Sequence, residues 1–239
     1  MCTVIVSVPA EASQPTRVLA IRDEDPTRAW NPLGPWWPDT HPGVDGVRDT
    51  RAGGAWLATL PEAGRLAVLL NVGGPRSEPG LASRGEVVLD AVSDRTSQTS
   101  RRTQPYTLVN VAGSRVSLTI SDGDGSRTRP LPPGVHMLVN SAIPDDPSFI
   151  RVPRWLEEFR ATAPGDDATD WFGPWLELLE RSTELPPTDD AALIRDNRPW
   201  GIPTLSLLFC TATVSDAHVD ATYVELARPG HWTPGSHLS

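Results

Sequence analysis

Short apolar runs separated by polar turns make up most of the chain, and this pattern predicts antiparallel β-structure. Residues 3–8 are β-branched and apolar, as in a buried strand, and residues 17–24 form a second such run that ends in charged residues. The two runs together predict a hairpin at the start of the fold. A continuous apolar run over residues 65–72 predicts a strand that is buried on both faces. Further strands are expected over residues 53–60, 106–111, 115–120, 134–140, 204–214 and 219–227.

Helical signals interrupt the strands at a few places. Ser83-Arg84-Gly85-Glu86 has the S-x-x-E pattern of a helix capping box. The apolar residues that follow it fall on one helical face. Further helices are expected around Trp155 to Phe159, over residues 174–181, and from Thr188 onward. Helices and hairpin-connected strands in this order indicate an α+β fold with antiparallel sheets.

Two segments show neither the alternation of a strand nor the period of a helix. Residues 25–54 are rich in Pro, Gly and Trp, so we expect a long loop, and a loop of this size is usually functional or mobile. Its tryptophans, with one from the following strand, are candidates to line an apolar ligand pocket. These residues are Trp30, Trp36, Trp37 and Trp56. The alternatives are packing of the loop for the first three and a place in the core for Trp56. Residues 229–239 are expected to be a C-terminal tail that follows a single domain of residues 1–228.

Charge and composition remove several classes of function. The 239 residues include 21 basic residues, all Arg, against 30 acidic ones, which gives a net charge of −9. This balance argues against non-specific binding of nucleic acids or anionic membranes. No apolar run approaches the ~20 residues of a membrane span. The first residues lack the basic segment of a secretory signal, so we expect a cytoplasmic protein.

Metal, cofactor and disulfide chemistry also find little support. Two cysteines cannot form a disulfide scaffold or a cysteine-rich zinc site. The five histidines show no metal-ligand spacing, and no strand is followed by a nucleotide-binding glycine motif. We therefore expect no metal and no cofactor.

Cys2 is the residue whose position suggests chemistry. If Met1 is removed, Cys2 becomes the first residue, and its free α-amine, with a pKa near ~7.7–8.0, can act as a base. A thiol on the same residue then carries its own proton acceptor, which is the logic of an N-terminal nucleophile. The alternative is that Cys2 is a small apolar residue of the core.

The end of the second predicted strand supplies charged partners for Cys2. A hairpin with residues 3–8 would bring Arg22 or Asp23 beside it. The arginine would stabilise a thiolate, and the acid would hold the ammonium or orient the thiol. Because neighbouring residues of a strand point to opposite faces, both side chains reach one site only if the strand end twists or bulges. The alternative is a solvated, charged strand end.

Several motifs in order resemble the NRDE family, also called the transport and Golgi organization 2 (TANGO2) family. The similarity covers about residues 1–92, and a weaker similarity follows at Leu138-Val139-Asn140-Ser141. The motifs that carry it are Met1-Cys2-Thr3, Arg22-Asp23-Glu24, Gly53-Gly54-Ala55-Trp56-Leu57, Gly64-Arg65-Leu66-Ala67-Val68-Leu69-Leu70-Asn71 and Ser83-Arg84-Gly85-Glu86.

The resemblance implies an N-terminal-nucleophile (Ntn) hydrolase-like fold, which is a four-layer αββα sandwich of antiparallel sheets. In the cysteine branch of that fold, an N-terminal Cys attacks a non-peptide amide. Carried over, Cys2 is the nucleophile, Arg22 and Asp23 support it, and Asn71 and Asn140 are candidates to hold the oxyanion.

The chain departs from the family pattern at two places. The first Asn of the Asn-Arg-Asp-Glu motif is Ile21 here. The family's Gly-Thr-Arg motif near the C-terminus is replaced by Gly201-Ile202-Pro203-Thr204, so the arginine is missing, and Arg198 is a candidate to replace it.

Two functions from different classes follow from these observations. The first is a cysteine hydrolase of the Ntn type that acts on a non-peptide amide of a small molecule. The second is a non-catalytic protein that binds or moves haem or an acyl lipid, a role to which the resembled family has been linked. The sequence has no Cys-Pro haem motif.

Overall fold

Two antiparallel β-sheets form the centre of the molecule in the computed structural model, which describes residues 2–73, 80–95, 102–162 and 171–233. The strands of the five-stranded sheet, in spatial order, are β10 (Gly134–Leu138), β1 (Thr3–Val8), β2 (Thr16–Glu24), β11 (Leu205–Val214) and β12 (Val219–Glu225). Those of the seven-stranded sheet are β3 (Trp30–Gly34), β4 (Asp45–Asp49), β5 (Ala55–Leu60), β6 (Arg65–Asn71), β7 (Tyr106–Ala112), β8 (Arg115–Ser121) and β9 (Ser126–Pro130).

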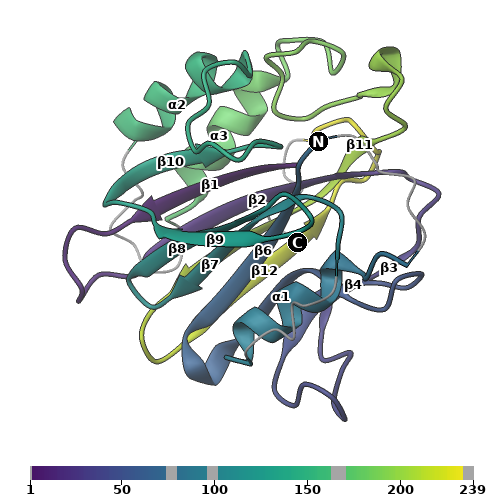
Figure 1. Cartoon of the computed structure of the whole chain (residues 1–239). Coiled ribbons are helices and arrows are strands. Elements are labelled where there is room, and N and C mark those ends of the chain that lie inside the picture. The colour runs from purple at the N-terminus through teal and green to yellow at the C-terminus, as the bar shows by residue number, and fades with distance from the viewer. Residues whose placement is uncertain (1, 74–79, 96–101, 163–170, 234–239) are drawn as a thin grey trace.

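Helices cover the outer faces of the two sheets (Figure 1). Helices α2 (Arg151–Ala161) and α3 (Gly173–Ser182) pack on the five-stranded sheet, and α1 (Arg84–Val92) packs on β5, β6 and β7 of the other. Two short 3-10 helices, η1 (Pro61–Ala63) and η2 (Arg198–Trp200), lie in connections. The predicted α+β sandwich of antiparallel sheets is confirmed, with its layers in the order αββα.

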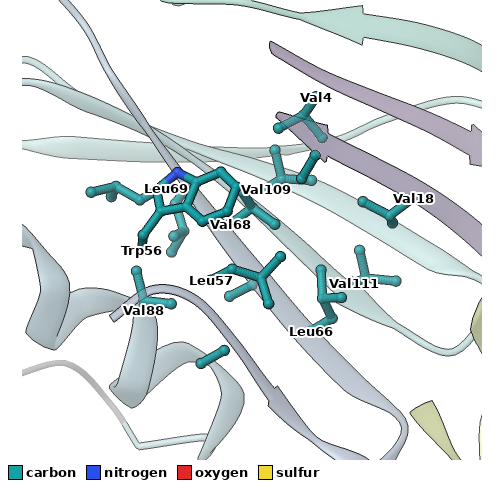
Figure 2. Packing of buried hydrophobic residues seen from close by; sticks show 14 of the residues in the cluster. Val4, Val18, Trp56, Leu57, Leu66, Val68, Leu69, Val88, Val109 and Val111 are labelled. Atoms are coloured by element: carbon teal, nitrogen blue, oxygen red, sulfur yellow. The ribbon is translucent and has the colours of Figure 1, made fainter. Parts of the chain in front are cut away.

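Alternation along β1 and β2 explains why both faces of the five-stranded sheet are buried. Val4 and Val18 point into the core between the sheets, where they meet Val109 and Val111 of β7 (Figure 2). The intervening residues Ile5, Leu19 and Ile21 point the other way, toward the helices. The helix-side core of these strands contains Ile5, Leu19 and Ile21 with Val152, Trp155, Phe159 and Trp175. Two faces buried by two different layers account for the near-continuous apolar runs of the sequence.

The two glycine-containing motifs pack against each other. A Cβ atom on Gly54, just before β5, would lie 2.5 Å from the carbonyl carbon of Gly85 at the start of α1. Only two glycines permit this approach of backbone to backbone. Ser83 caps α1, although its Oγ accepts from the N–H of Gly85 at 3.2 Å rather than from that of Glu86.

Two sequence predictions about local structure are wrong, and one strand was not predicted. Residues 25–54 are not a long loop, because they contain the strands β3 and β4. Pro and Gly hide the alternation of these short strands near one edge of the sheet. No helix begins at Thr188; the segment forms turns instead. In addition, the exposed strand β9 was not predicted, since its residues are all polar or Pro.

The first residues of the segment expected to be a tail pack on the five-stranded sheet. The N–H of Gly230 donates to Ser206 O at 2.7 Å, and Trp232 packs on Phe209 with ring centroids 5.5 Å apart. Residues 234–239 of that segment lie outside the described residues. Among the described residues, no helix is long and apolar enough to cross a membrane.

Candidate functional site

Strand pairing brings the predicted site residues to one edge of the sandwich. Cys2 immediately precedes β1, in which Thr3 pairs with Ile21 of β2 and Val4 pairs with Leu138 of β10. Continuing these registers places Arg22 on one side of Cys2 and Asn140 on the other. The hairpin predicted from the first two strands therefore does bring Arg22 and Cys2 together.

Cys2 is buried at this edge, with 5% of its surface exposed. Its Sγ lies 3.7 Å from the backbone carbonyl oxygen of Asp23, to which the thiol donates. Burial raises the pKa of the Cys2 thiol, and the nearby Asp23 carboxylate raises it further, while Arg22 opposes this. The thiol is therefore protonated at neutral pH, and its use as a nucleophile requires a base.

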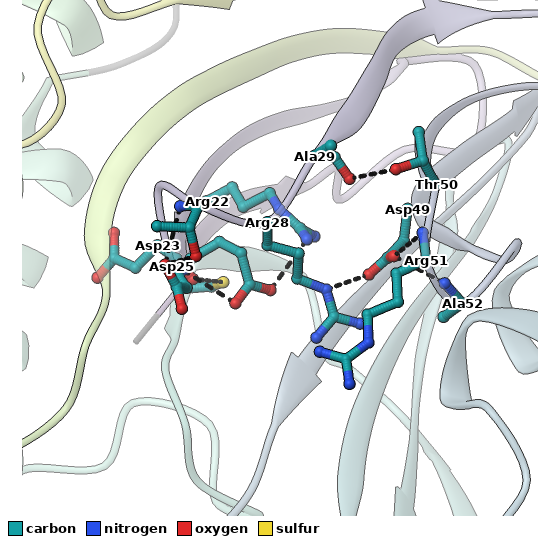
Figure 3. A network of polar contacts seen from close by, with 12 residues as sticks. Arg22, Asp23, Asp25, Arg28, Ala29, Asp49, Thr50, Arg51 and Ala52 are labelled. Carbon is teal, nitrogen blue, oxygen red and sulfur yellow. Dashed lines mark hydrogen bonds and ion pairs between the residues drawn. The ribbon is translucent and has the colours of Figure 1, made fainter.

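Arg22 points into the layer between the two sheets, together with Cys2. Its guanidinium carbon lies 5.4 Å from the centre of the Trp56 ring, which belongs to the seven-stranded sheet. Its Nη2 donates to Glu24 Oε2 at 3.0 Å, an ion pair included in the polar network of Figure 3. Its Nε is buried and has no hydrogen-bond partner among the described residues. The cation therefore lies between an aromatic face and one carboxylate, beside the thiol.

Asp23 points to the opposite face of the sheet, as strand alternation requires. Its Oδ1 accepts from Ser206 Oγ at 2.6 Å, and its Oδ2 accepts from Asn197 Nδ2 at 3.1 Å. The register irregularity in this region lies between Ser206 and Leu208 of the partner strand β11, while Arg22 and Asp23 still point to opposite faces. The side chains of Arg22 and Asp23 therefore do not reach one site, and Asp23 contacts the thiol through its backbone carbonyl and not through its carboxylate.

Two buried arginines surround the carboxylate side of the site. Arg195 is fully buried; its Nε donates to Asn197 Oδ1 at 3.0 Å and its Nη2 to Asp190 Oδ1 at 3.1 Å. Arg151, at the start of α2, is 1% exposed, and its Nε and Nη2 have no hydrogen-bond partner among the described residues. The pKa of Arg151 is lowered to about 10, mainly by burial and also by the charge of Arg195, whereas Asp23 and Cys2 partly offset both effects. Sequence reasoning missed both arginines.

The two candidate oxyanion asparagines also meet at this edge. Asn140 Nδ2 donates to the backbone oxygen of Asn71 at 2.7 Å, which links the two sheets. Asn140 Oδ1 is buried without a partner among the described residues, and the side chain of Asn71 is exposed. A cavity of about 570 Å³ adjoins this pair, since Val72 and Ala142 are among its lining residues.

Comparison with protein families identifies the chain. Residues 1–207 match the model of the family described as Transport and Golgi organisation 2. The chain belongs to the TANGO2 family. This match includes every site residue described above. A comparison with curated proteins found no match.

Arg198, the candidate to replace the arginine missing from the family's C-terminal motif, lies at the surface. The side chain of Arg198 is 62% exposed and pairs with Asp196, with Nη2 2.6 Å from Oδ2. Its hydrogen bonds within the described residues go to Asp196, which is the expected behaviour of a surface residue. Arg151 and Arg195 are the arginines buried on that side of the site.

The four tryptophans proposed for a ligand pocket occupy different surroundings in this TANGO2 protein. The indole N–H groups of Trp30, Trp36 and Trp37 donate to Tyr223 Oη at 2.7 Å, Pro32 O at 2.6 Å and Gly53 O at 2.8 Å. These bonds anchor the β3–β4 hairpin, as the packing alternative expects. Trp56 is buried beneath Arg22, and its Nε1 has no partner among the described residues. A role of these residues in ligand binding stays a prediction.

No group of three or more His, Cys, Asp or Glu side chains within the described ranges is arranged to hold a metal ion.

Proposed function

We propose that the protein is an N-terminal cysteine hydrolase that cleaves a non-peptide amide of a small molecule. The observation that carries the proposal is the position of Cys2, whose buried thiol lies between the end of β2 and the register position of Asn140. A cysteine that served only as core filling would not need a cation at its side, yet Arg22 is buried beside it.

The proposed reaction begins with a chain that starts at Cys2. Met1, which must be removed, lies outside the described residues. The α-amine of Cys2 takes the proton of Sγ, and Sγ then attacks the carbonyl carbon of the amide. The C–N bond breaks, the leaving amine takes the proton, and a thioester on Cys2 remains. Water then hydrolyses the thioester and restores the thiol, so that no oxidant or reductant is needed.

Positive charge around Cys2 supports this chemistry in a chain whose net charge is −9. Arg22 opposes the rise in the pKa of the Cys2 thiol, and Arg84 lies close enough for its own pKa to respond to Glu24, Arg28 and Cys2. Burial is the main reason that the pKa of Arg84 is lowered. Cations held in a buried site favour the thiolate and the developing oxyanion.

Asn140 is the proposed oxyanion donor, with Asn71 beside it. In the present arrangement Asn140 Nδ2 donates to Asn71 O, so the amide must rotate or share this donor when a substrate binds. A preorganised donor of this kind contributes about 3–4 kcal/mol to the transition state.

The two cysteines provide a matched test. Both are free and buried, but Cys210 lies within β11, and burial raises its pKa to about 12. With a panel of N-acyl p-nitroanilides of increasing chain length, Cys2→Ala should lower the rate by about 10³-fold or more, and Cys210→Ala should keep it. Equal rates for wild type and Cys2→Ala would refute the proposal. Two free thiols also support a reducing, cytoplasmic compartment.

A second candidate function is binding of an apolar ligand such as haem or an acyl-CoA. The cavity of about 570 Å³ beside Asn71 favours it, because Ile120, Pro105 and Val72 contribute apolar surface to its wall. Ile120→Trp would fill this cavity. If the cavity binds the ligand, haemin should produce a saturable change in its absorption spectrum with the wild type and a much weaker one with Ile120→Trp. No saturable change with haemin or acyl-CoA would remove this candidate.

A further inference from the structure

Arg151 has a free edge of its guanidinium group inside the protein. The Nε–H and the Nη2–H of an arginine point in parallel from one side of the planar group, and this fork matches the two oxygens of a carboxylate. In Arg151 both of these nitrogens are buried, and neither has a hydrogen-bond partner among the described residues. The unused donors are thus the pair that makes a bidentate contact.

The surroundings of Arg151 compensate its charge only in part. Arg151 is the first residue of α2, where the helix dipole presents its positive end. The acid with the largest effect on Arg151 is Asp23 of β2, whose two oxygens are already hydrogen-bonded by Ser206 and Asn197. Asp190 is bound by Arg195, which is itself a neighbouring cation. A buried, unpaired cation costs several kcal/mol, and proteins keep such groups where a ligand supplies the opposite charge.

The helix pattern strengthens the case that this arginine has a role in binding. Arg151 lies on the same face of α2 as Trp155 and Phe159, four and eight residues on, and both of these are buried in the core beneath the helix. An arginine can usually lift its charged end out of such a face into water. Here the whole side chain stays inside, and its guanidinium carbon lies 5.8 Å from the centre of the Phe149 ring.

We propose that the free edge of Arg151 binds a carboxylate group of the substrate, on the helix side of Cys2. This inference rests on the proposed function, which makes the bound molecule a substrate. The binding of a carboxylate itself does not depend on catalysis. It narrows the substrate class to small amides that carry a carboxylate. Arg151 is then a residue that determines specificity, whereas Arg22 acts on the thiol from the other face of the sheet.

The probes are benzoate and benzamide, which have the same shape and differ in charge. With benzoate in excess at about 100 times its Kd, the Tm of the wild type should rise by roughly 5–10 °C. Benzamide at the same concentration, with sodium chloride added to match the ionic strength, should leave the Tm unchanged. Equal effects of the two probes on the wild type would overturn the proposal without any variant.

Three variants locate the effect. Arg151→Met should weaken benzoate binding by about 10- to 100-fold, because two charge-assisted hydrogen bonds are lost. It should keep or raise the Tm without ligand, since the unpaired buried charge is gone. Arg198→Met, which changes an exposed arginine, should bind benzoate as the wild type does. Unchanged benzoate binding in Arg151→Met would place the anion elsewhere and overturn the proposal. If Arg151→Met does not fold, Arg151→Lys, which keeps the charge but not the fork, serves the same purpose.

Cys2→Ala separates this inference from the proposed function. If Cys2→Ala and wild type both bind benzoate and neither hydrolyses any amide, the carboxylate site stands and the hydrolase proposal fails. If hydrolysis depends on Cys2 but carboxylate-bearing amides are cleaved no faster than their methyl esters, the hydrolase stands and the carboxylate site fails as part of it.

Discussion

Asp23→Asn removes one charge from the buried network while keeping its shape. The carboxylate accepts hydrogen bonds from Ser206 and Asn197, and its charge partly offsets the lowering of the Arg151 pKa by burial. Bonds to a charged acceptor contribute about 1.5–3 kcal/mol each, against about 1 for neutral ones. Weakening both bonds and leaving the cation less compensated should cost about 3 kcal/mol of the free energy of unfolding.

Urea unfolding measures this cost directly. For Asp23→Asn the midpoint should fall with an unchanged slope, and the Tm should fall by roughly 6–12 °C. Asp220→Asn, which changes an exposed carboxylate on β12, is the matched control and should unfold as the wild type does. A loss of less than about 0.5 kcal/mol for Asp23→Asn would show that the network does not carry the assigned energy.

The same variant has a chemical readout at Cys2. Burial is the main cause of the raised pKa of the Cys2 thiol, and the Asp23 charge adds to it. Asp23→Asn should therefore lower this pKa and speed alkylation of Cys2 by iodoacetamide at a fixed pH. Cys210 reports on general opening of the fold, so a parallel rise at both cysteines would refute the electrostatic explanation.

Three further predictions concern the fold. Gly54→Ala should destabilise the protein by several kcal/mol in urea unfolding, because its Cβ would lie 2.5 Å from Gly85 backbone, whereas Gly125→Ala, with no atom within 4 Å, should be tolerated. Trp175→Ala should cost about 3–5 kcal/mol in the same assay, since the ring is fully buried. Burial raises the pKa of Asp145, but bonds from His136 and the Met137 N–H outweigh it and hold this pKa below its usual value. This stabilisation is present above the usual pKa of an aspartate and is lost as the pH falls through the lowered one, so Asp145→Asn should flatten the loss of stability with acid below about pH 4. An unchanged acid profile would contradict this assignment.

Most of the sandwich was predictable because its strands are buried on two faces. The runs in residues 3–8 and 65–72 are apolar at nearly every position, and the hairpin between β1 and β2 follows from their adjacency. The strands β3, β4 and β9 were not predictable in the same way. They are short, contain Pro, Gly or charged residues, and owe their structure to pairing with a neighbour rather than to their own pattern.

Part of the site was predictable from the sequence and part was not. Cys2, Arg22 and Asn140 come together through register, which the sequence motifs already suggested. The network around the Asp23 carboxylate was not predictable from the motifs, because Ser206 and Asn197 reach Asp23 from segments more than 170 residues away. One signal was present for Arg151, namely its position four residues before Trp155, at helical spacing. For Arg195 the corresponding signal was a charge directly after the apolar residues 191–194.

The mass of the intact purified protein tests the central claim most directly. The proposed mechanism needs the free α-amine of Cys2 as its base, because burial keeps the thiol protonated at neutral pH. The account predicts a chain that is lighter than the full sequence by one methionine residue and begins at Cys2. A protein that keeps Met1, or whose α-amine at Cys2 is acetylated, would contradict the account.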